Sequence, residues 1–165
     1  MTTNKIDVGD RAPDFTLPNA AGEPVRLYNL LEAQPVVLYF YPKDDTPGCT
    51  AEACAFRDQY EQFTDAGAAV VGVSGDSPAS HQAFAQKHGL PFVLLSDESN
   101  AVRKRYGVPA TLGFLPGRVT YVIDRQGTVR MAFNSQFKAR QHVSRALGTL
   151  REAMGADGEA APPAG

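Results

Sequence analysis

Strand-like and helix-like segments alternate along most of this 165-residue chain, and the alternation limits its possible folds more than any other feature. The longest apolar run, 35–41, is β-prone and predicts a central strand at 36–41 that is covered on both faces. Similar runs predict further strands at 68–73 and 92–95, with helical segments between them. Alternating strands and helices favour an α/β sheet.

Four helices are predicted from apolar spacing and capping residues, over 50–64, 78–88, 99–106 and 138–153. In the first of them, spacings of 3, 4 and 3 put four apolar side chains on one face: Ala53, Phe56, Tyr60 and Phe63. The second begins with Ser77 as N-cap and Pro78 at the first helical position, and it ends at Gly89.

Two hairpins complete the predicted order. The segment 14–28 forms two short strands around a turn, and 119–124 and 128–133 form two more around a short polar link. Because the second hairpin adds antiparallel strands, we expect a mixed central sheet flanked by helices, with an N-terminal β-hairpin extension. We assign residues 1–154 to one domain and expect 155–165, a low-complexity segment, to be a disordered tail.

Charge and hydropathy exclude several functions. The formal net charge is −2, and the tail supplies it through Asp157 and Glu159, so the remaining chain is neutral. A neutral domain has no electrostatic reason to bind nucleic acid or an anionic membrane. No apolar run approaches the ~20 residues of a membrane helix. The first ten residues lack the apolar region of a secretion signal, so we expect a cytosolic protein.

The cysteines, Cys49 and Cys54, are the only two in the chain, which excludes a disulfide framework or a four-cysteine zinc site. We expect no metal and no cofactor. With Thr46 as N-cap and Pro47 at the first helical position, Cys49 falls in the first turn of a helix that follows a buried strand. Unpaired N–H groups and the helix dipole stabilise an anion there, so this position favours a thiolate nucleophile.

The spacing of the two cysteines restricts any bond between them. Residues five apart in an ideal α-helix have Cα atoms ~8.6 Å apart. An unstrained disulfide needs less than ~7 Å. A disulfide between these cysteines would therefore require the first turns of the helix to unwind, although an inert pair of thiols is the simpler alternative. Three histidines are interpreted as surface or helix-end residues without a catalytic role: His81, His88 and His142.

The segment 41–54 reads Tyr-Pro-x-Asp-x-Thr-Pro-Gly-Cys-Thr-x-Glu-x-Cys, which resembles the active-site motif of the peroxiredoxins, in particular the bacterioferritin-comigratory-protein (PrxQ) subgroup. The resemblance covers most of residues 6–150 and includes further matching segments at 9–15, 71–74, 106–108 and 118–124. It implies a thioredoxin-like fold and thiol-dependent reduction of hydrogen peroxide and organic hydroperoxides.

The resemblance also implies a role for each cysteine. Cys49 would be the peroxidatic residue, whose thiolate attacks the terminal peroxide oxygen and becomes a sulfenic acid. Cys54 would be the resolving residue, which forms an intramolecular disulfide with Cys49. Thioredoxin or a similar dithiol would then reduce that disulfide, as in an atypical two-cysteine peroxidase.

Four further residues could assist this chemistry. The leaving oxygen develops negative charge, and the hydroxyl of Thr46 and the guanidinium of Arg118 can donate hydrogen bonds to it. Pro42 would shield the thiolate, and Glu52 could orient Arg118 through a charge-assisted bond. In simpler interpretations Thr46 only caps the helix, Arg118 is a surface residue and Glu52 interacts with the helix dipole.

Two other functions fit the same cysteines. A disulfide reductase is one, although such proteins usually carry Cys-x-x-Cys. A redox-sensing module that is oxidised without turnover is the other. We expect a monomer, with a dimer as the alternative. The sequence departs from the PrxQ pattern in the short segment 109–117, which could line the substrate entrance, and in 139–142.

Overall fold

The computed structural model describes residues 5–108, 117–135 and 138–154, with the side chains of the last two residues excepted. The predicted tail at 155–165 and nearly all of the 109–117 segment lie outside this part of the chain. Among the described helices, none has the length and apolar character needed to cross a bilayer.

A five-stranded sheet forms the centre of the structure, in the order β5-β4-β3-β6-β7. Its strands are β3 (Val36–Phe40), β4 (Ala69–Ser74), β5 (Val93–Ser96), β6 (Val119–Ile123) and β7 (Val129–Asn134). Strands β3, β4 and β5 run parallel, whereas β6 is antiparallel to β3 and β7 is antiparallel to β6. The sheet is therefore mixed, as predicted, and its central strand is the apolar run that the sequence places there.

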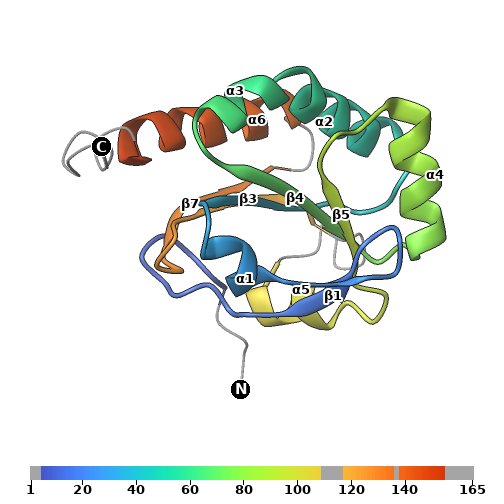
Figure 1. Ribbon diagram of the computed structural model, residues 1–165, viewed down its shortest axis with the longest axis horizontal. Helices are drawn as coiled ribbons and strands as arrows, with labels where there is room; N and C mark the ends of the chain where they lie inside the picture. Colours follow the sequence, from blue (N-terminus) through green and yellow to red (C-terminus); the bar gives the residue numbers. More distant parts are fainter. Residues whose placement is uncertain (1–4, 109–116, 136–137, 155–165) are drawn as a thin grey trace.

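The sheet separates two layers (Figure 1). One face is covered by α2 (Pro47–Asp58), α3 (Tyr60–Asp65), α4 (Pro78–His88) and α6 (Ala139–Thr149), which continues into the π-helical turn Leu150–Met154. The other face carries α1 (Leu27–Leu31), α5 (Ala101–Tyr106) and the predicted N-terminal hairpin of β1 (Thr16–Pro18) and β2 (Pro24–Arg26).

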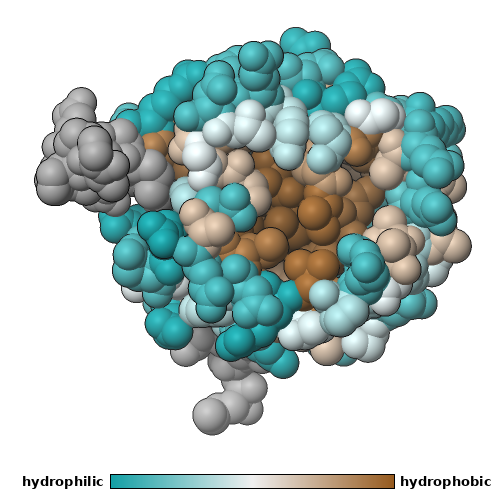
Figure 2. Space-filling view, in the orientation of Figure 1, coloured by the Kyte–Doolittle hydropathy of each residue, from teal (hydrophilic) through white to brown (hydrophobic). Residues whose placement is uncertain are grey.

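Successive side chains of β3 point to opposite faces of the sheet and contribute to both hydrophobic cores. Val37 and Tyr39 belong to the core beneath α2 and α6, whereas Val36, Leu38 and Phe40 belong to the core on the opposite face. Every residue of β3 is buried, as expected of a strand with both faces covered. Figure 2 shows hydrophobic side chains gathered in the middle of one view of the molecule, between more polar surfaces above and below.

The helix predicted over 50–64 is in fact two helices. The first begins at Pro47, and the helical conformation is interrupted at Gln59, whose φ of −103° and ψ of 8° lie outside the helical region. The apolar spacing persists across the break because α3 buries Phe63 against the same core. The caps of α4 are confirmed: Ser77 accepts a hydrogen bond from the Ser80 N–H, and Gly89 has a φ of 59°.

Candidate active site

Cys49 lies where the central strand leads into a helix. After β3 ends, a short loop runs to Thr46, whose extended backbone precedes the first helical residue, Pro47. The Thr50 N–H donates to the Thr46 carbonyl at 2.8 Å and closes the first turn. Cys49 is the third residue of this helix and is 1% exposed. The predicted first-turn position of Cys49 is therefore confirmed.

Arg118 reaches this cysteine from a neighbouring strand. It directly precedes β6, whose Val119 pairs with Phe40 at the end of β3. Its Nη2 donates to Cys49 Sγ at 3.4 Å, and its Nη1 donates to Glu52 Oε1 at 2.5 Å. Arg118 and Glu52 are both buried, so their ion pair is shielded from water. The two donors of one guanidinium thus connect the thiol to a carboxylate one helical turn later.

The residue before the cysteine is small for a geometric reason. A Cβ atom at Gly48 would lie 3.0 Å from Nη2 of Arg118, which is tighter than ordinary van der Waals contact. The bonds of Arg118 to Cys49 and Glu52 leave this guanidinium little room to shift. Glycine at this position therefore lets Arg118 lie against the first turn of α2.

Glu52 is fully buried in α2, and its two oxygens have different surroundings. Burial raises the pKa of Glu52 to about 7, although the charge and hydrogen bond of Arg118 oppose the shift. Its Oε1 accepts from Arg118, whereas Oε2 has no hydrogen bond within the described residues and lies 3.6 Å from Nδ1 of His142. A proton taken up by Glu52 would therefore reside on Oε2, the oxygen that faces His142.

His142 joins the site from the first turn of α6 and is fully buried, so of the two positions predicted for it, surface or helix end, the surface one is wrong. Its Nε2 lies 2.7 Å from the carbonyl of Ser135, an acceptor, so this nitrogen carries the ring proton. Its Nδ1 then accepts from the hydroxyl of Thr120, also at 2.7 Å. Burial lowers the pKa of His142 to about 4, so its imidazole is neutral near pH 7.

We expect Glu52→Gln to flatten the pH dependence of stability. In the unfolded chain Glu52 loses its proton near pH 4.5, whereas the folded protein holds it up to about pH 7. The folded state therefore binds more protons between these values, and its Glu52-dependent stability falls as the pH rises through this window. The change is on the order of 3 kcal/mol.

Urea unfolding at pH 5 and pH 8 measures this effect. The difference in unfolding free energy, wild type minus Glu52→Gln, should be larger at pH 5 than at pH 8. Glu61→Gln, an exposed change in the neighbouring helix, is the matched control and should leave the difference constant. An equal difference in unfolding free energy between wild type and Glu52→Gln at both pH values would contradict the raised pKa of Glu52.

The loop before α2 places Thr46 and Pro42 without direct hydrogen bonds to the thiol. The Thr46 hydroxyl donates to the carbonyl of Lys43 at 2.9 Å, and it does not cap the helix. The predicted N-cap position of Thr46 is thus confirmed for the backbone, without a capping bond from its side chain. Pro42 is partly buried directly after Tyr41, the last residue of the apolar run.

A buried network that the sequence analysis missed anchors this loop to α4. Asp44 accepts hydrogen bonds from the hydroxyls of Tyr41 and Ser80 at 2.6 and 2.9 Å, and its Oδ2 lies 2.7 Å from Nδ1 of His81. His81 lies in the first turn of α4 and is fully buried, which contradicts the surface alternative predicted for it, and its Nε2 lies 2.9 Å from the carbonyl of Leu95. The sequence feature that could have indicated this network was Asp44, which belongs to the 41–54 motif.

The same network contains the one group of possible metal ligands found in the described residues: Asp44, Asp76 and His81. Their ligand atoms lie within 4.8 Å of one another. Asp76 already accepts from the Asp44 N–H at 2.8 Å and from the Ser74 hydroxyl at 2.6 Å. A cation would have to displace these bonds, so hydrogen bonding accounts for the cluster.

Cys54 lies in the same helix as Cys49, since α2 runs unbroken from Pro47 to Asp58. Both cysteines are free, Cys49 buried and Cys54 partly exposed. Because helical geometry keeps residues five apart beyond disulfide distance, the two cysteines cannot form a disulfide in this arrangement.

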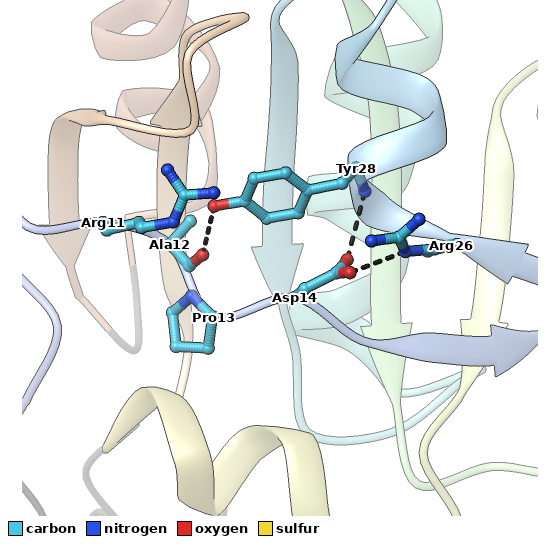
Figure 3. A pocket seen from close by; sticks show the side chains of 6 residues that line it. All are labelled: Arg11, Ala12, Pro13, Asp14, Arg26 and Tyr28. Atoms are coloured by element: carbon cyan, nitrogen blue, oxygen red, sulfur yellow. Dashed lines mark hydrogen bonds and ion pairs between the residues drawn. The ribbon is translucent and has the colours of Figure 1, made fainter.

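A separate cavity of about 330 Å³ lies against the N-terminal extension, lined by Arg11, Ala12, Pro13, Asp14, Arg26 and Tyr28 (Figure 3). Its polar groups already pair with one another. The hydroxyl of Tyr28 donates to the Ala12 carbonyl at 2.6 Å, and Asp14 accepts from Arg26 at 2.6 Å and from the Tyr28 N–H at 3.2 Å. These bonds tie the extension to α1 and give the cavity a structural explanation.

A first-turn cysteine bonded by a buried arginine, on a mixed sheet of this order, is the arrangement of cysteine-dependent peroxidases with a thioredoxin-like fold. Comparison with known proteins agrees. The model of the AhpC/TSA family matches residues 8–132, and the chain belongs to this family. Within it, the chain groups with the peroxiredoxin Q and bacterioferritin comigratory proteins, and it is a thiol-dependent peroxidase.

Three similar proteins illustrate the relationship. Chloroplastic peroxiredoxin Q of Sedum lineare is 55% identical over 148 residues, which cover 89% of this chain and 79% of the relative. The crystal structure of peroxidoxin BcpB from Mycobacterium tuberculosis superposes with a TM-score of 0.83 at 41% identity, covering 89% and 97% of the two chains. A bacterioferritin comigratory protein of Xanthomonas campestris, described with alkyl peroxide reduction activity, gives a TM-score of 0.80 at 30% identity, covering 90% and 99%.

These relatives correct one prediction. The Sedum protein is chloroplastic by name, as are further relatives that are 53–55% identical. The predicted cytosolic location is contradicted by this finding and was wrong. It relied on the composition of the first ten residues, which is a poor guide to the compartment.

Proposed function

We propose that Cys49 is the peroxidatic residue of this peroxidase and that Arg118 is its principal electrostatic partner. The contact between Arg118 Nη2 and Cys49 Sγ at 3.4 Å carries the proposal. The Cys49 thiolate attacks the terminal oxygen of the peroxide, the O–O bond breaks, and the sulfur becomes a sulfenic acid. The leaving oxygen takes the bonding electron pair and a proton, and departs as water or as an alcohol.

Arg118 suits both stages of this step. Its guanidinium remains charged at any physiological pH and holds its donors in a fixed plane. One donor stabilises the thiolate before the attack and can stabilise the negative charge that develops on the oxygens during it. Glu52 fixes the orientation of the guanidinium through the 2.5 Å bond to Nη1.

Thr46 and Pro42 complete the proposed site. Rotation of the Thr46 hydroxyl away from the Lys43 carbonyl would supply a second donor to a bound peroxide, at the cost of the 2.9 Å hydrogen bond within the loop. Pro42 has no N–H that would need a partner, so it suits a half-buried loop that excludes water from the thiol.

Cys54 is proposed as the resolving residue. Its thiolate attacks the Cys49 sulfenic sulfur, the S–O bond breaks, and the oxygen leaves as water while an intramolecular disulfide forms. This step requires the first turns of α2 to unwind, because both cysteines lie in one intact helix. A dithiol such as thioredoxin then reduces the disulfide and allows α2 to reform.

The substrates proposed are hydrogen peroxide and organic hydroperoxides. The alkyl peroxide reduction named for the Xanthomonas relative supports the second class. An uncharged peroxide needs no long-range steering, which is compatible with the neutral charge of residues 1–154. We further propose that the protein acts as a monomer, without nucleic acid or membrane partners.

Cys54→Ser tests the division of roles between the cysteines. In a thioredoxin-coupled assay we expect turnover to stop, because no intramolecular disulfide can form. The reduced variant should still consume one equivalent of peroxide at a rate within about threefold of wild type, as Cys54 takes no part in the first attack. Stopped-flow measurement of the first equivalent, with mass spectrometry to detect the sulfenic acid, separates the two steps.

Sustained thioredoxin-dependent turnover by Cys54→Ser would contradict the resolving role. Two assays of the wild-type protein distinguish the alternatives. A disulfide reductase would reduce insulin without peroxide, and a sensor would be oxidised once without turnover in excess reductant.

A further inference from the structure

A second buried arginine lies beside the site and was not singled out by the sequence. Arg103 is in α5, on the opposite face of the sheet from α2, and is 7% exposed. Its Nη1 donates to the carbonyl of Gly117 at 2.7 Å, and its Nη2 donates to the carbonyl of Tyr41 at 2.5 Å. One planar guanidinium therefore holds two backbone segments that are far apart in the sequence.

The two carbonyls belong to the residues directly before Pro42 and Arg118. Tyr41 begins the loop that leads to Cys49, and Gly117 begins the segment that carries Arg118 into β6. The position of the Cys49 loop relative to Arg118 therefore depends on Arg103 as well as on strand pairing. A shift of either segment would alter the 3.4 Å contact between Arg118 and Cys49.

The charge of Arg103 is not cancelled by a directly bonded carboxylate in the part of the chain that the structure describes. Asp97 is close, but its oxygens accept from the backbone N–H groups of Val102 and Arg103 at 3.2 and 2.9 Å. Asp97 is still the strongest of the charges that act on Arg103, and Cys49, Tyr121 and Arg118 follow it. A negative charge on Cys49 is favourable to the Arg103 cation, and the reverse follows by reciprocity.

We propose that Arg103 is a positioning residue of the peroxidase. It holds the Cys49 loop and the Arg118 segment at a fixed separation, and its positive charge favours the Cys49 thiolate. The proposal rests on the proposed function of Cys49 and adds a residue from the far side of the sheet. The two effects differ in what they need: the separation needs the guanidinium fork, whereas the electrostatic effect needs only a cation.

Arg103→Met and Arg103→Lys, each in the Cys54→Ser background, separate these effects. We expect Arg103→Met to react with hydrogen peroxide about tenfold more slowly, the size expected for losing hydrogen bonds from a charged donor. Its pH profile for alkylation of Cys49 by iodoacetamide should move to higher pH. Arg103→Lys should keep the alkylation profile of Cys54→Ser alone but react more slowly than it with peroxide, since an ammonium lacks the planar fork.

Arg105→Met is the matched control, because Arg105 lies in the same helix, is exposed, and also donates to a backbone carbonyl, that of Asp14. It should change neither the rate of the peroxide reaction nor the pH profile of alkylation. The proposal is overturned if Arg103→Met in the Cys54→Ser background matches Cys54→Ser alone in both measurements. It is equally overturned if Arg103→Met and Arg103→Lys slow the peroxide reaction alike while their alkylation profiles stay at the wild-type position, since Arg103 would then be only structural.

A substitute variant and a measurement that does not involve peroxide complete the test. Should Arg103→Met fail to fold, Arg103→Gln keeps hydrogen-bond donors without charge and is expected to shift the alkylation profile as well. Alkylation does not depend on peroxide chemistry. Absence of peroxide reaction in every variant, including wild type, would therefore refute the function proposed for Cys49, while the alkylation profiles would still decide the role of Arg103.

Discussion

Cys49→Ser is expected to reduce peroxide consumption to the uncatalysed background, a loss on the order of a thousandfold or more. A serine hydroxyl stays protonated at neutral pH and cannot form the sulfenic acid through which the oxygen is transferred. Replacing Sγ by Oγ changes little in volume, so α2 and the Arg118–Glu52 pair should persist. The measurement is peroxide consumption with dithiothreitol as reductant, which requires no specific protein partner.

Circular dichroism and urea unfolding show whether Cys49→Ser is folded. Cys54→Ser serves as the control, since it also removes one thiol but should still consume the first equivalent of peroxide. Consumption by Cys49→Ser at the wild-type rate would place the reaction elsewhere and refute the proposed site.

Arg118→Met is expected to slow the first attack by about 100-fold or more, the usual cost of losing one donor aimed at developing negative charge. The substitution also leaves Glu52 buried without its cation. Loss of one member of a buried pair costs about 3–5 kcal/mol of stability, unless the carboxyl takes up a proton. Because the pKa of Glu52 is already raised to about 7, we expect protonation to limit that cost.

A double variant separates chemistry from folding. Arg118→Met/Glu52→Gln replaces both members of the ion pair by uncharged side chains, so no buried carboxylate is left without its partner. Its stability should therefore recover relative to Arg118→Met. The peroxide rate should stay low, because the donor to Cys49 Sγ is still absent. Recovery of the rate together with stability would mean that Arg118 acts only by holding Glu52. Stopped-flow rates and urea midpoints of the two variants decide between these results.

The fold was largely predictable because its elements carry local signals. The apolar run at 36–41, the Ser77-Pro78 start and the polar link at 125–127 each specify structure through neighbouring residues alone. The break at Gln59 was missed because the 3.6-residue apolar pattern continues across it into α3. A helical pattern reports which face is buried and does not detect a single residue with non-helical backbone angles.

Parts of the site depend on contacts between distant residues. Arg118 lies 69 residues from Cys49, and only the family motif singled it out. His81, His142 and Arg103 carry no local mark of burial, and their partners are hydroxyls, carboxylates and carbonyls that the sheet brings together. Polar residues are usually exposed, so without the fold a surface position was a reasonable alternative to a helix end, and it was wrong for His81 and His142, which are buried in the first turns of their helices.

The break at Gln59 also determines how much of the chain must rearrange in the proposed cycle. Helix α2 contains only the 12 residues Pro47–Asp58, and α3 is a second helix whose first turn is closed at the Gln59 carbonyl by the N–H groups of Gln62 and Phe63. Phe63 can stay in the core through α3 while the residues around Cys49 and Cys54 open and close. The oxidised protein would then keep the remaining packing as a template on which a short helix reforms in microseconds, far faster than a whole domain could refold.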